Sequence, residues 1–421
     1  MLSLRRQRKI YLDGFAGKKP LTPVSYADLE AQAKTRLSPE AFAYLAGGAG
    51  NERTIETNRS ALDSIKIHPR MLGGVQEVRM QQQWRAHTLP APFMLSPIGV
   101  LELAHKDGDL EEARACRALG VPMIISSQAS HPMEDIAREL GDGPRLFQLY
   151  YSKSKELSRS FIRRAESIGC SAIVITLDTT LLGWRLRDLG LGYNPFIQGK
   201  GIAQYYSDPV FQALPDPVTD GSAKPPITFE LIANLLKLCN RLPGGLLYNL
   251  KGNRGLKTAT KFTSIFSNPG IQWEDIELIR SWTPLPIYLK GILRPDDALK
   301  AISVGVDGII ISNHGGRQID GSVSSVEALA RIAPVVKGKL DLWMDSGIRS
   351  GSDAYKCLAL GANGVMIGRP YAMALACRGE QGVKDCITNI FSELELIMAL
   401  SGCHTIEDIN TDLITHPWKT I

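Results

Sequence analysis

Short apolar runs alternate with amphipathic stretches along most of the chain. The runs are largely non-alternating, which is typical of strands buried on both faces of a parallel sheet. Eight such runs predict strands at Ala91–Pro97, Val121–Ser127, Arg145–Tyr151, Ala172–Asp178, Leu285–Gly291, Gly308–Asn313, Asp341–Gly347 and Gly364–Arg369.

Helical spacing of apolar residues fills most of the gaps between these runs. Helices are predicted at Gly108–Leu119, at Pro132–Leu140, up to Ile168, and at Asp297–Val304, Val326–Ala333 and Ser352–Leu360. Eight β/α units favour a closed barrel over an open, doubly wound sheet. The predicted fold class is therefore α/β, a (β/α)8 TIM barrel.

Two segments lie outside this alternation of strands and helices. Tyr26–Ala46 has helical spacing and predicts an N-terminal helical segment that stops at the following glycines. Tyr193–Asn268 follows the fourth strand, is rich in Gly, Pro, Ser and Lys, and contains one helical run, Phe229–Arg241. Such an insertion is more often a lid or a partner surface than a second core, and we expect partial mobility. The expected organisation is one domain over 1–421, with the barrel at about 89–400 and the insertion at about 193–268.

Composition and charge narrow the function classes. The chain has 421 residues with 44% apolar and 22% charged, and a net charge of +5 is too mild to indicate a nucleic-acid partner. No apolar stretch is long enough to predict a membrane span. The basic Leu4–Lys9 segment is expected to be a frayed tail, with a weak transit peptide as the alternative. Seven cysteines without a C-x-x-C pair predict neither disulfides nor a metal site, and favour a reducing compartment, the cytoplasm.

The segment Ile309–Gly321 carries the clearest candidate chemistry. A predicted strand runs directly into Asn313-His314-Gly315-Gly316-Arg317, at the strand end where parallel α/β proteins place their active sites. Arg317 could hold a carboxylate through two hydrogen bonds, and His314 could take a proton from the neighbouring carbon or hydroxyl. A lone His-x-x-Arg is more often part of a structural turn than of an active site. Because this one lies at a strand end between glycines, the structural and the catalytic interpretation have equal weight.

Other strand ends supply side chains that could assist this pair. Asp178 could orient the His314 ring, and Arg185 could join Arg317 in holding a carboxylate. Lys290 ends a strand in the barrel interior, where a buried ammonium needs an anionic partner or a lowered pKa. It could form a Schiff base, as in aldolases of this fold, or face an electron-rich cofactor ring, and both alternatives stay open.

Glycine-rich turns follow the last two strands. Gly347-Ile348-Arg349-Ser350-Gly351 and Gly368-Arg369-Pro370 lie where barrels often bind a phosphate, and Arg349 and Arg369 add positive charge. Each turn alone could be an ordinary βα connection, whereas the two together favour phosphate binding. No Walker or Rossmann glycine motif is present, so a nucleoside triphosphate or a Rossmann-bound nicotinamide is unsupported.

These motifs, in this order and spacing, resemble the FMN-dependent L-2-hydroxy acid oxidases and dehydrogenases, the family of glycolate oxidase and lactate oxidase. The resemblance extends from about Tyr26 to Ile414, and S-N-H-G-G-R-Q at Ser312–Gln318 is its most specific part. Ser96–His105, Leu182–Leu189 and Tyr205–Phe211 are most similar to lactate 2-monooxygenase. The resemblance implies FMN and oxidation of a small 2-hydroxy acid to the 2-keto acid with oxygen as acceptor; oxidative decarboxylation of lactate, or a larger acid, is the alternative. It also implies a homotetramer.

The resemblance implies a role for each matching residue. His314 would be the base, Asp178 would stabilise its charged form, and Lys290 would lie beside the flavin. Arg185, Arg317, Tyr44 and Tyr150 would bind the substrate. The implied cofactor-binding residues are Pro97, Ile98, Gly99, Ser126, Gln148, Thr176, Lys290, Ser312, Asp345, Gly347, Arg349, Gly368 and Arg369.

Two positions depart from the commonest family pattern. Gly99 stands where many of the oxidases have Ala, near flavin N5, although monooxygenase-like members have Gly. Gln128 stands where glycolate oxidase has a bulky aromatic residue. Both positions bear on the substrate side chain and on the fate of the product.

Overall fold

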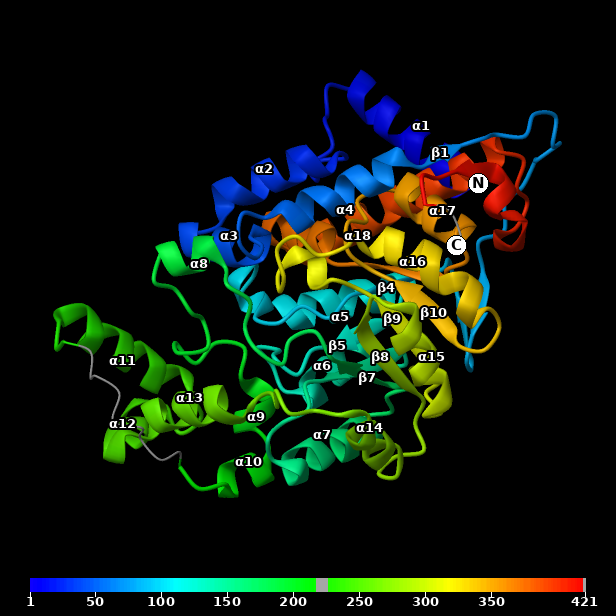
Figure 1. Ribbon diagram of the computed structural model, residues 1–421. Coiled ribbons are helices and arrows are strands. Elements are labelled where there is room, and N and C mark those ends of the chain that lie inside the picture. Colours follow the sequence, from blue (N-terminus) through cyan, green and yellow to red (C-terminus); the bar gives the residue numbers. More distant parts are fainter. Residues whose placement is uncertain (217–225, 419–421) are drawn as a thin grey trace.

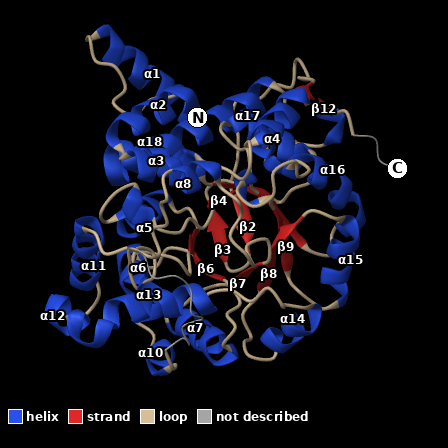
Figure 2. Cartoon of the chain, turned by 60° about the vertical axis from the view of Figure 1, so that its left-hand side comes forward, coloured by secondary structure: helices blue, strands red, loops and turns tan. Residues whose placement is uncertain are grey.

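A closed barrel of eight parallel strands forms the centre of the molecule (Figure 2). The computed structural model describes residues 1–216 and 226–418. The barrel order is β10-β11-β4-β5-β6-β7-β8-β9, and this confirms the predicted (β/α)8 fold. The strands are β4 (Phe93–Leu95), β5 (Met123–Ile125), β6 (Arg145–Leu149), β7 (Ile173–Thr176), β8 (Ile287–Ile292), β9 (Gly308–Ile311), β10 (Asp341–Met344) and β11 (Gly364–Ile367).

Helices surround the barrel on its outer side (Figure 1). Several begin at a serine whose side chain accepts a hydrogen bond from the third helical amide, as Ser154, Ser324 and Ser350 do. The barrel helices are α5 (Gly108–Leu119), α6 (Met133–Leu140), α7 (Lys155–Ser167), α14 (Trp273–Arg280), α15 (Pro295–Ser303), α16 (Ser325–Val336), α17 (Gly351–Ala359) and α18 (Arg369–Leu400). Of these, α14 and α18 were not predicted.

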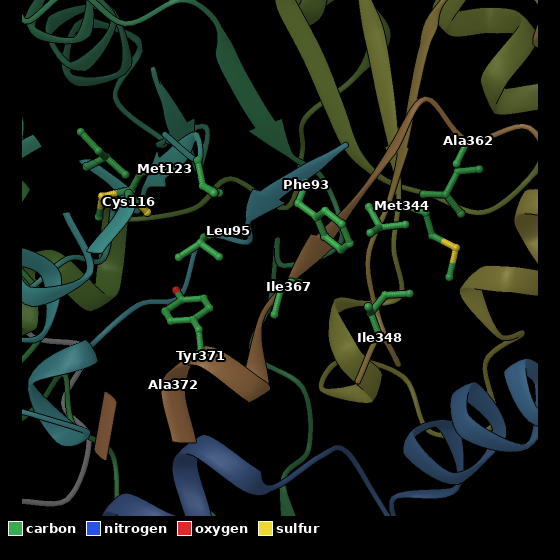
Figure 3. Packing of buried hydrophobic residues seen from close by; sticks show 14 of the residues in the cluster. Phe93, Leu95, Cys116, Met123, Met344, Ile348, Ala362, Ile367, Tyr371 and Ala372 are labelled. Carbon is green, nitrogen blue, oxygen red and sulfur yellow. The ribbon is translucent and has the colours of Figure 1, made fainter. Parts of the chain in front are cut away.

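Both faces of the barrel strands are buried, which explains their non-alternating pattern. Phe93 and Leu95 of β4 face the helices with Ile367 of β11 (Figure 3), and Phe93 packs against Phe391 of α18 with ring centroids 4.7 Å apart. Met94, between them, belongs to the separate cluster inside the barrel. Burial on both sides favours apolar residues at consecutive positions.

The amino end of the barrel is closed by a hairpin. Strands β2 (Gln82–Trp84) and β3 (His87–Leu89) pair antiparallel, and the buried indole of Trp84 donates a hydrogen bond to the hydroxyl of Tyr288 at 3.1 Å. This plug leaves the carboxyl ends of the strands as the place for a cavity.

The N-terminal region differs from expectation in two ways. Leu2–Phe15 forms helix α1 instead of a frayed tail, because Ser3 is buried and both its amide and its hydroxyl bond Glu395 of α18. The expected single helix over Tyr26–Ala46 is two helices, α2 (Tyr26–Arg36) and α3 (Pro39–Ala46), since Pro39 cannot continue a helix and instead begins one. Helix α4 (Arg53–Ser64) follows.

The insertion between β7 and β8 is more helical than predicted. Besides α11 (Phe229–Arg241), the one run expected, it contains α8 (Leu186–Gly190), α9 (Ala203–Tyr206), α10 (Pro209–Ala213), α12 (Gly245–Leu250) and α13 (Arg254–Ile265). Most are too short to show a period in the sequence. In Figure 1, α11, α12 and α13 extend to one side of the barrel; positions 217–225 of the predicted insertion lie outside the described residues.

Short elements complete the fold. They are β1 (Lys66–Ile67), β12 (Ile414–Thr415), and the 3-10 turns η1 (Leu101–Leu103), η2 (Lys251–Asn253), η3 (His314–Gly316), η4 (Ile406–Asp408) and η5 (Thr411–Leu413). Within residues 1–216 and 226–418, no helix combines the length and hydropathy needed to cross a bilayer.

Candidate active site

A cavity opens at the carboxyl end of the barrel. It holds about 1060 Å³ out to its mouth, and every barrel strand or the loop after it contributes to its wall. The polar or glycine residues that these strands and loops contribute are Ser96, Gly99, Gln128, Gln148, Tyr150, Thr176, Thr179, Arg185, Lys290, His314, Gly315, Arg317, Asp345, Ser346, Gly347, Arg349, Gly368 and Arg369. Most of the polar strand-end residues named from the sequence therefore face one space, whereas Ser126, Asp178 and Ser312 do not line it.

His314 is held in a fixed orientation on the loop after β9. Its Nδ1 lies 2.8 Å from Oδ1 of Asp178 and 3.1 Å from the hydroxyl of Thr179. Its φ of 57° lies in the left-handed region, where non-glycine residues are uncommon. The amide of His314 bonds the Ser312 hydroxyl at 3.0 Å and holds this conformation. Asp178 lies behind the ring and does not line the cavity.

The charge states of this pair favour a neutral imidazole beside a carboxylate. Burial lowers the pKa of His314, and the carboxylate of Asp178 offsets only part of that effect. Burial opposes ionisation of Asp178, but His314 and Lys290 outweigh it, and the net pKa lies below the ordinary value. A neutral ring with Nδ1 engaged leaves Nε2 available as a proton acceptor.

Two guanidinium groups converge beside the ring of Tyr44. The Cζ of Arg317 lies 4.9 Å from that ring centroid and the Cζ of Arg185 lies 5.7 Å away. Arg317 donates to the carbonyl oxygen of Gly47 at 2.8 Å, and Arg185 reaches a carboxylate only at 4.0 Å, on Asp188. Burial, followed by repulsion from Arg185, lowers the pKa of Arg317 to about 9. Both charges are therefore poorly neutralised and suit an anionic ligand.

Lys290 is buried with an anionic partner. Its Nζ lies 2.8 Å from Oδ2 of Asp345 and 2.7 Å from the hydroxyl of Ser312. The same carboxylate oxygen accepts a hydrogen bond from Ser96 at 3.2 Å. The anionic partner that a buried lysine requires is thus Asp345.

Gln148 has its amide direction fixed by a chain of hydrogen bonds. Its Oε1 accepts from the hydroxyl of Ser126 at 3.0 Å, and its Nε2 donates to Thr176 Oγ1 at 3.1 Å. Ser126, like Ser312, supports a lining residue from behind and does not line the cavity itself.

Arg349 and Arg369 follow β10 and β11 and line the same cavity, where Arg369 and Arg317 both donate to the carbonyl oxygen of Gly47. Arg369 follows the N-cap Gly368 of α18 and donates to the carbonyl oxygens of Gly315 and Gly47 at 2.7 and 2.8 Å. Its buried Nε has no partner among the described residues. Burial, followed by repulsion from Arg349, lowers the pKa of Arg369 to about 10. A helix start with two unneutralised arginines fits a phosphate.

Comparison with known proteins decides the family. Residues 33–416 match the model of FMN-dependent dehydrogenases. The chain belongs to that family. An L-lactate oxidase of Lysinibacillus sphaericus is 38% identical over 389 residues, 92% of each chain, and human 2-hydroxyacid oxidase 1 is 34% identical over 92% of this chain and 95% of its own. A crystal structure of mandelate oxidase superposes with a TM-score of 0.75 at 33% identity, covering 95% of this chain and all of the other. The family activity is FMN-dependent oxidation of 2-hydroxy acids.

The residues of the cavity fit FMN. Arg349 offers positive charge for a phosphate, as does Arg369, whose buried Nε has no partner in the described part of the chain. The fixed amide of Gln148 offers a polar edge for a flavin ring. Lys290, held between Asp345 and Ser312, offers a positive charge for a ring that becomes anionic on reduction.

Several lining residues were not predicted from the sequence. Phe196 and Phe266 come from the two ends of the insertion, and Leu182 and Thr179 come from the loop after β7. Thr179 could have been suspected because it follows Asp178 directly. The two phenylalanines carried no local signal beyond their place in a segment expected to act as a lid.

Proposed function

We propose that this enzyme oxidises the Cα–OH of a small L-2-hydroxy acid to the 2-keto acid and passes the electrons to oxygen. The observation that carries the proposal is that His314, held from behind by Asp178, lines the same cavity as Arg317 and Arg185. A carboxylate held by the arginines brings the adjacent carbon and its hydroxyl within reach of a fixed imidazole.

The side chains divide the work as follows. Arg317 and Arg185 bind the substrate carboxylate, with the hydroxyls of Tyr44 and Tyr150 as hydrogen-bond donors. Burial, followed by the charge of Asp178, raises the pKa of Tyr150 to about 12, so its hydroxyl keeps its proton. His314 takes a proton from Cα, or from the hydroxyl if hydrogen leaves Cα as hydride, and Asp178 stabilises the resulting imidazolium.

The cofactor-binding roles are assigned by the strand end that carries each residue. Pro97, Ile98 and Gly99, with Gln148 and Thr176, would line the flavin ring, and Lys290 would face it with Asp345 and Ser312 as supports. Gly347, Arg349, Gly368 and Arg369 would hold the phosphate end. FMN, when bound, supplies the acceptor for the two electrons that leave the substrate.

Oxidative decarboxylation of the lactate 2-monooxygenase type is the second candidate, and Gly99 favours it. A Cβ at position 99 would lie 2.8 Å from Cβ and 3.0 Å from Oε1 of Gln128. The chain thus has the glycine of monooxygenase-like family members at position 99, and the side chain of Gln128 fills the space beside it. Gln128 also replaces an aromatic wall with an amide, beside the apolar side chains of Phe196 and Phe266.

Self-association is part of the proposal. The segment beside the cavity mouth exposes a set of large apolar side chains, which we call the mouth patch: Leu181, Trp184, Leu186, Leu189, Leu191 and Ile197. Trp184 is 71% exposed. Side chains of this kind, concentrated in 17 residues (181–197), suit an interface with further copies of the chain, as in a homotetramer. Seven free, buried cysteines favour the cytoplasm as compartment.

The test is anaerobic mixing of the FMN-loaded enzyme with L-lactate, D-lactate, glycolate and L-mandelate, followed by admission of air. We expect loss of the flavin absorbance with an L-acid or glycolate and not with D-lactate. Peroxide would then identify an oxidase, and CO₂ with little peroxide a monooxygenase. An enzyme whose flavin none of these acids reduces would contradict the assignment to small substrates.

A further inference from the structure

Tyr26 stacks on Arg349, one of the two arginines proposed to bind the phosphate of FMN. The Cζ of Arg349 lies 3.9 Å from the centroid of the Tyr26 ring, well within the distance at which a guanidinium interacts favourably with an aromatic face. Arg349 lines the main cavity and Tyr26 does not. Tyr26 also precedes residues 33–416, the part of the chain matched by the family model.

Arg349 has few other contacts to direct its side chain. Its backbone amide is fixed by a 2.8 Å bond to Asp353, but its guanidinium donates only to the carbonyl oxygen of Ile348 at 3.3 Å among the described residues. No carboxylate there forms a salt bridge with it. The face of Tyr26 is therefore the main contact that can hold the guanidinium in place.

A second cavity gives Arg349 an alternative direction. It holds about 810 Å³ between α1, the start of α2 and α18, and both Arg349 and Tyr26 line it. Glu393 lines the same second cavity and could attract the guanidinium of Arg349 if it turned away from the main cavity. A contact that keeps Arg349 in the main cavity would thus affect cofactor binding.

Tyr26 itself is held firmly. Its hydroxyl donates to Glu30 Oε1 at 3.0 Å, and it is the first residue of α2, which begins at the capping residue Ser25. Just before it, the buried hydroxyl of Thr22 donates to Asp385 of α18 at 2.9 Å. Helix α1 closes the second cavity from the other side, where Arg6 Nε donates to Asn389 Oδ1 at 2.8 Å.

We propose that Tyr26 is a positioning residue for the cofactor: it holds the guanidinium of Arg349 toward the phosphate of FMN, so that the N-terminal helices α1 and α2 act as the outer wall of the phosphate site. This inference rests on the proposed role of Arg349 as a phosphate ligand. Tyr26 acts only through Arg349, and its effect is confined to the phosphate.

Riboflavin, which has the same ring and ribityl chain as FMN but no phosphate, provides the test. Dissociation constants of FMN and riboflavin are measured by flavin fluorescence with the full-length apoprotein and with Tyr26→Leu, Tyr26→Phe and Arg349→Leu. We expect Tyr26→Leu to weaken FMN binding by about 3- to 30-fold, the range of a cation–π contact, and to leave riboflavin within about 2-fold. Tyr26→Phe keeps the stacking face and should bind FMN nearly as the parent does.

The outcomes separate the two claims. The role of Tyr26 would be overturned if Tyr26→Leu weakened the binding of FMN and riboflavin equally, or did not weaken FMN binding at all. The phosphate role of Arg349 would still stand in that case, provided that Arg349→Leu weakened FMN binding selectively. If Arg349→Leu bound both flavins like the parent, the phosphate role of Arg349 itself would fail. Should Tyr26→Leu not fold, Tyr26→Met makes the same comparison.

Discussion

The Nδ1 atom of His314 lies 2.8 Å from Oδ1 of Asp178 across the ends of strands β9 and β7. This contact fixes which ring nitrogen carries a hydrogen and which is free to act. Asp178 Oδ2 is buried and has no partner among the described residues. Among the described residues, the partners of the carboxylate are therefore the imidazole and the hydroxyl of Thr179, which donates to the same Oδ1 at 3.1 Å. This arrangement suits a group that stabilises a transient positive charge on the imidazole.

Replacing Asp178 tests this coupling. We expect Asp178→Asn to slow flavin reduction by about 10²- to 10⁴-fold, the range for impaired general-base catalysis. Because the carboxylate raises the pKa of His314 against the lowering effect of burial, its removal should also move the acid limb of the pH–rate profile to lower pH. Stopped-flow reduction across pH 5 to 8 measures both effects.

The control is Asp63→Asn, which removes an exposed carboxylate with 66% side-chain exposure and should leave the rate unchanged. A parent enzyme that lost activity already above pH 6.5, the ordinary His value, would contradict the lowered pKa of His314. An acid limb of the pH–rate profile that stayed in place in Asp178→Asn would contradict the coupling between His314 and Asp178.

Arg317 should bind substrate through its fork of two donors. Arg317→Lys keeps a charge but not the two-pronged geometry, so we expect an increase in KM of about 10- to 100-fold, corresponding to one lost charge-assisted hydrogen bond. Arg187→Lys, two residues from Arg185 and paired with Glu52, is the matched control and should change KM little. Equal KM in the two variants would exclude Arg317 as the carboxylate ligand.

Gly99 and Gln128 should be coupled in stability. Gly99→Ala places a Cβ 2.8 Å from that of Gln128, and we expect a loss of about 1–3 kcal/mol from overpacking. Gln128→Gly in the same chain should relieve most of this loss, because it removes both the Cβ and the Oε1 that the new methyl group would meet. Thermal unfolding of the four combinations measures the coupling; strictly additive effects would show that the two positions do not compete for space.

The mouth patch should mediate self-association. Trp184→Glu introduces a charge at its most exposed residue, and we expect a smaller mass by light scattering than for the parent. Tyr11→Glu, at another exposed aromatic residue of 70% exposure on α1, is the control. A parent enzyme that is monomeric, or a Trp184→Glu variant with unchanged mass, would contradict this part of the proposal.

The sequence predicted the barrel and its polar mouth because both depend on local patterns. Strands buried on both faces leave continuous apolar runs, and the residue after each run must face the carboxyl end. The same argument predicts that Arg349 and Arg369 lie in the cavity wall, because both follow strand ends in glycine-rich turns.

The remaining features depend on long-range packing that no local pattern records. Helix α1 is largely polar, and the contact that docks it joins Ser3 to Glu395, 392 residues away. Phe196 and Phe266 reach the cavity only because the insertion folds back over the barrel mouth. The contact between Tyr26 and Arg349 likewise joins the start of α2 to the loop after β10, which is far away in the sequence.

The most direct test of the central claim is anaerobic stopped-flow reduction of FMN-loaded His314→Gln by the best substrate of the parent enzyme. Glutamine can donate and accept hydrogen bonds but cannot accept the proton, so the account predicts normal FMN content with flavin reduction slowed by about 10²- to 10⁴-fold or more. Reduction at a rate near that of the parent, with FMN bound, would show that His314 is not the base and would contradict the proposed mechanism.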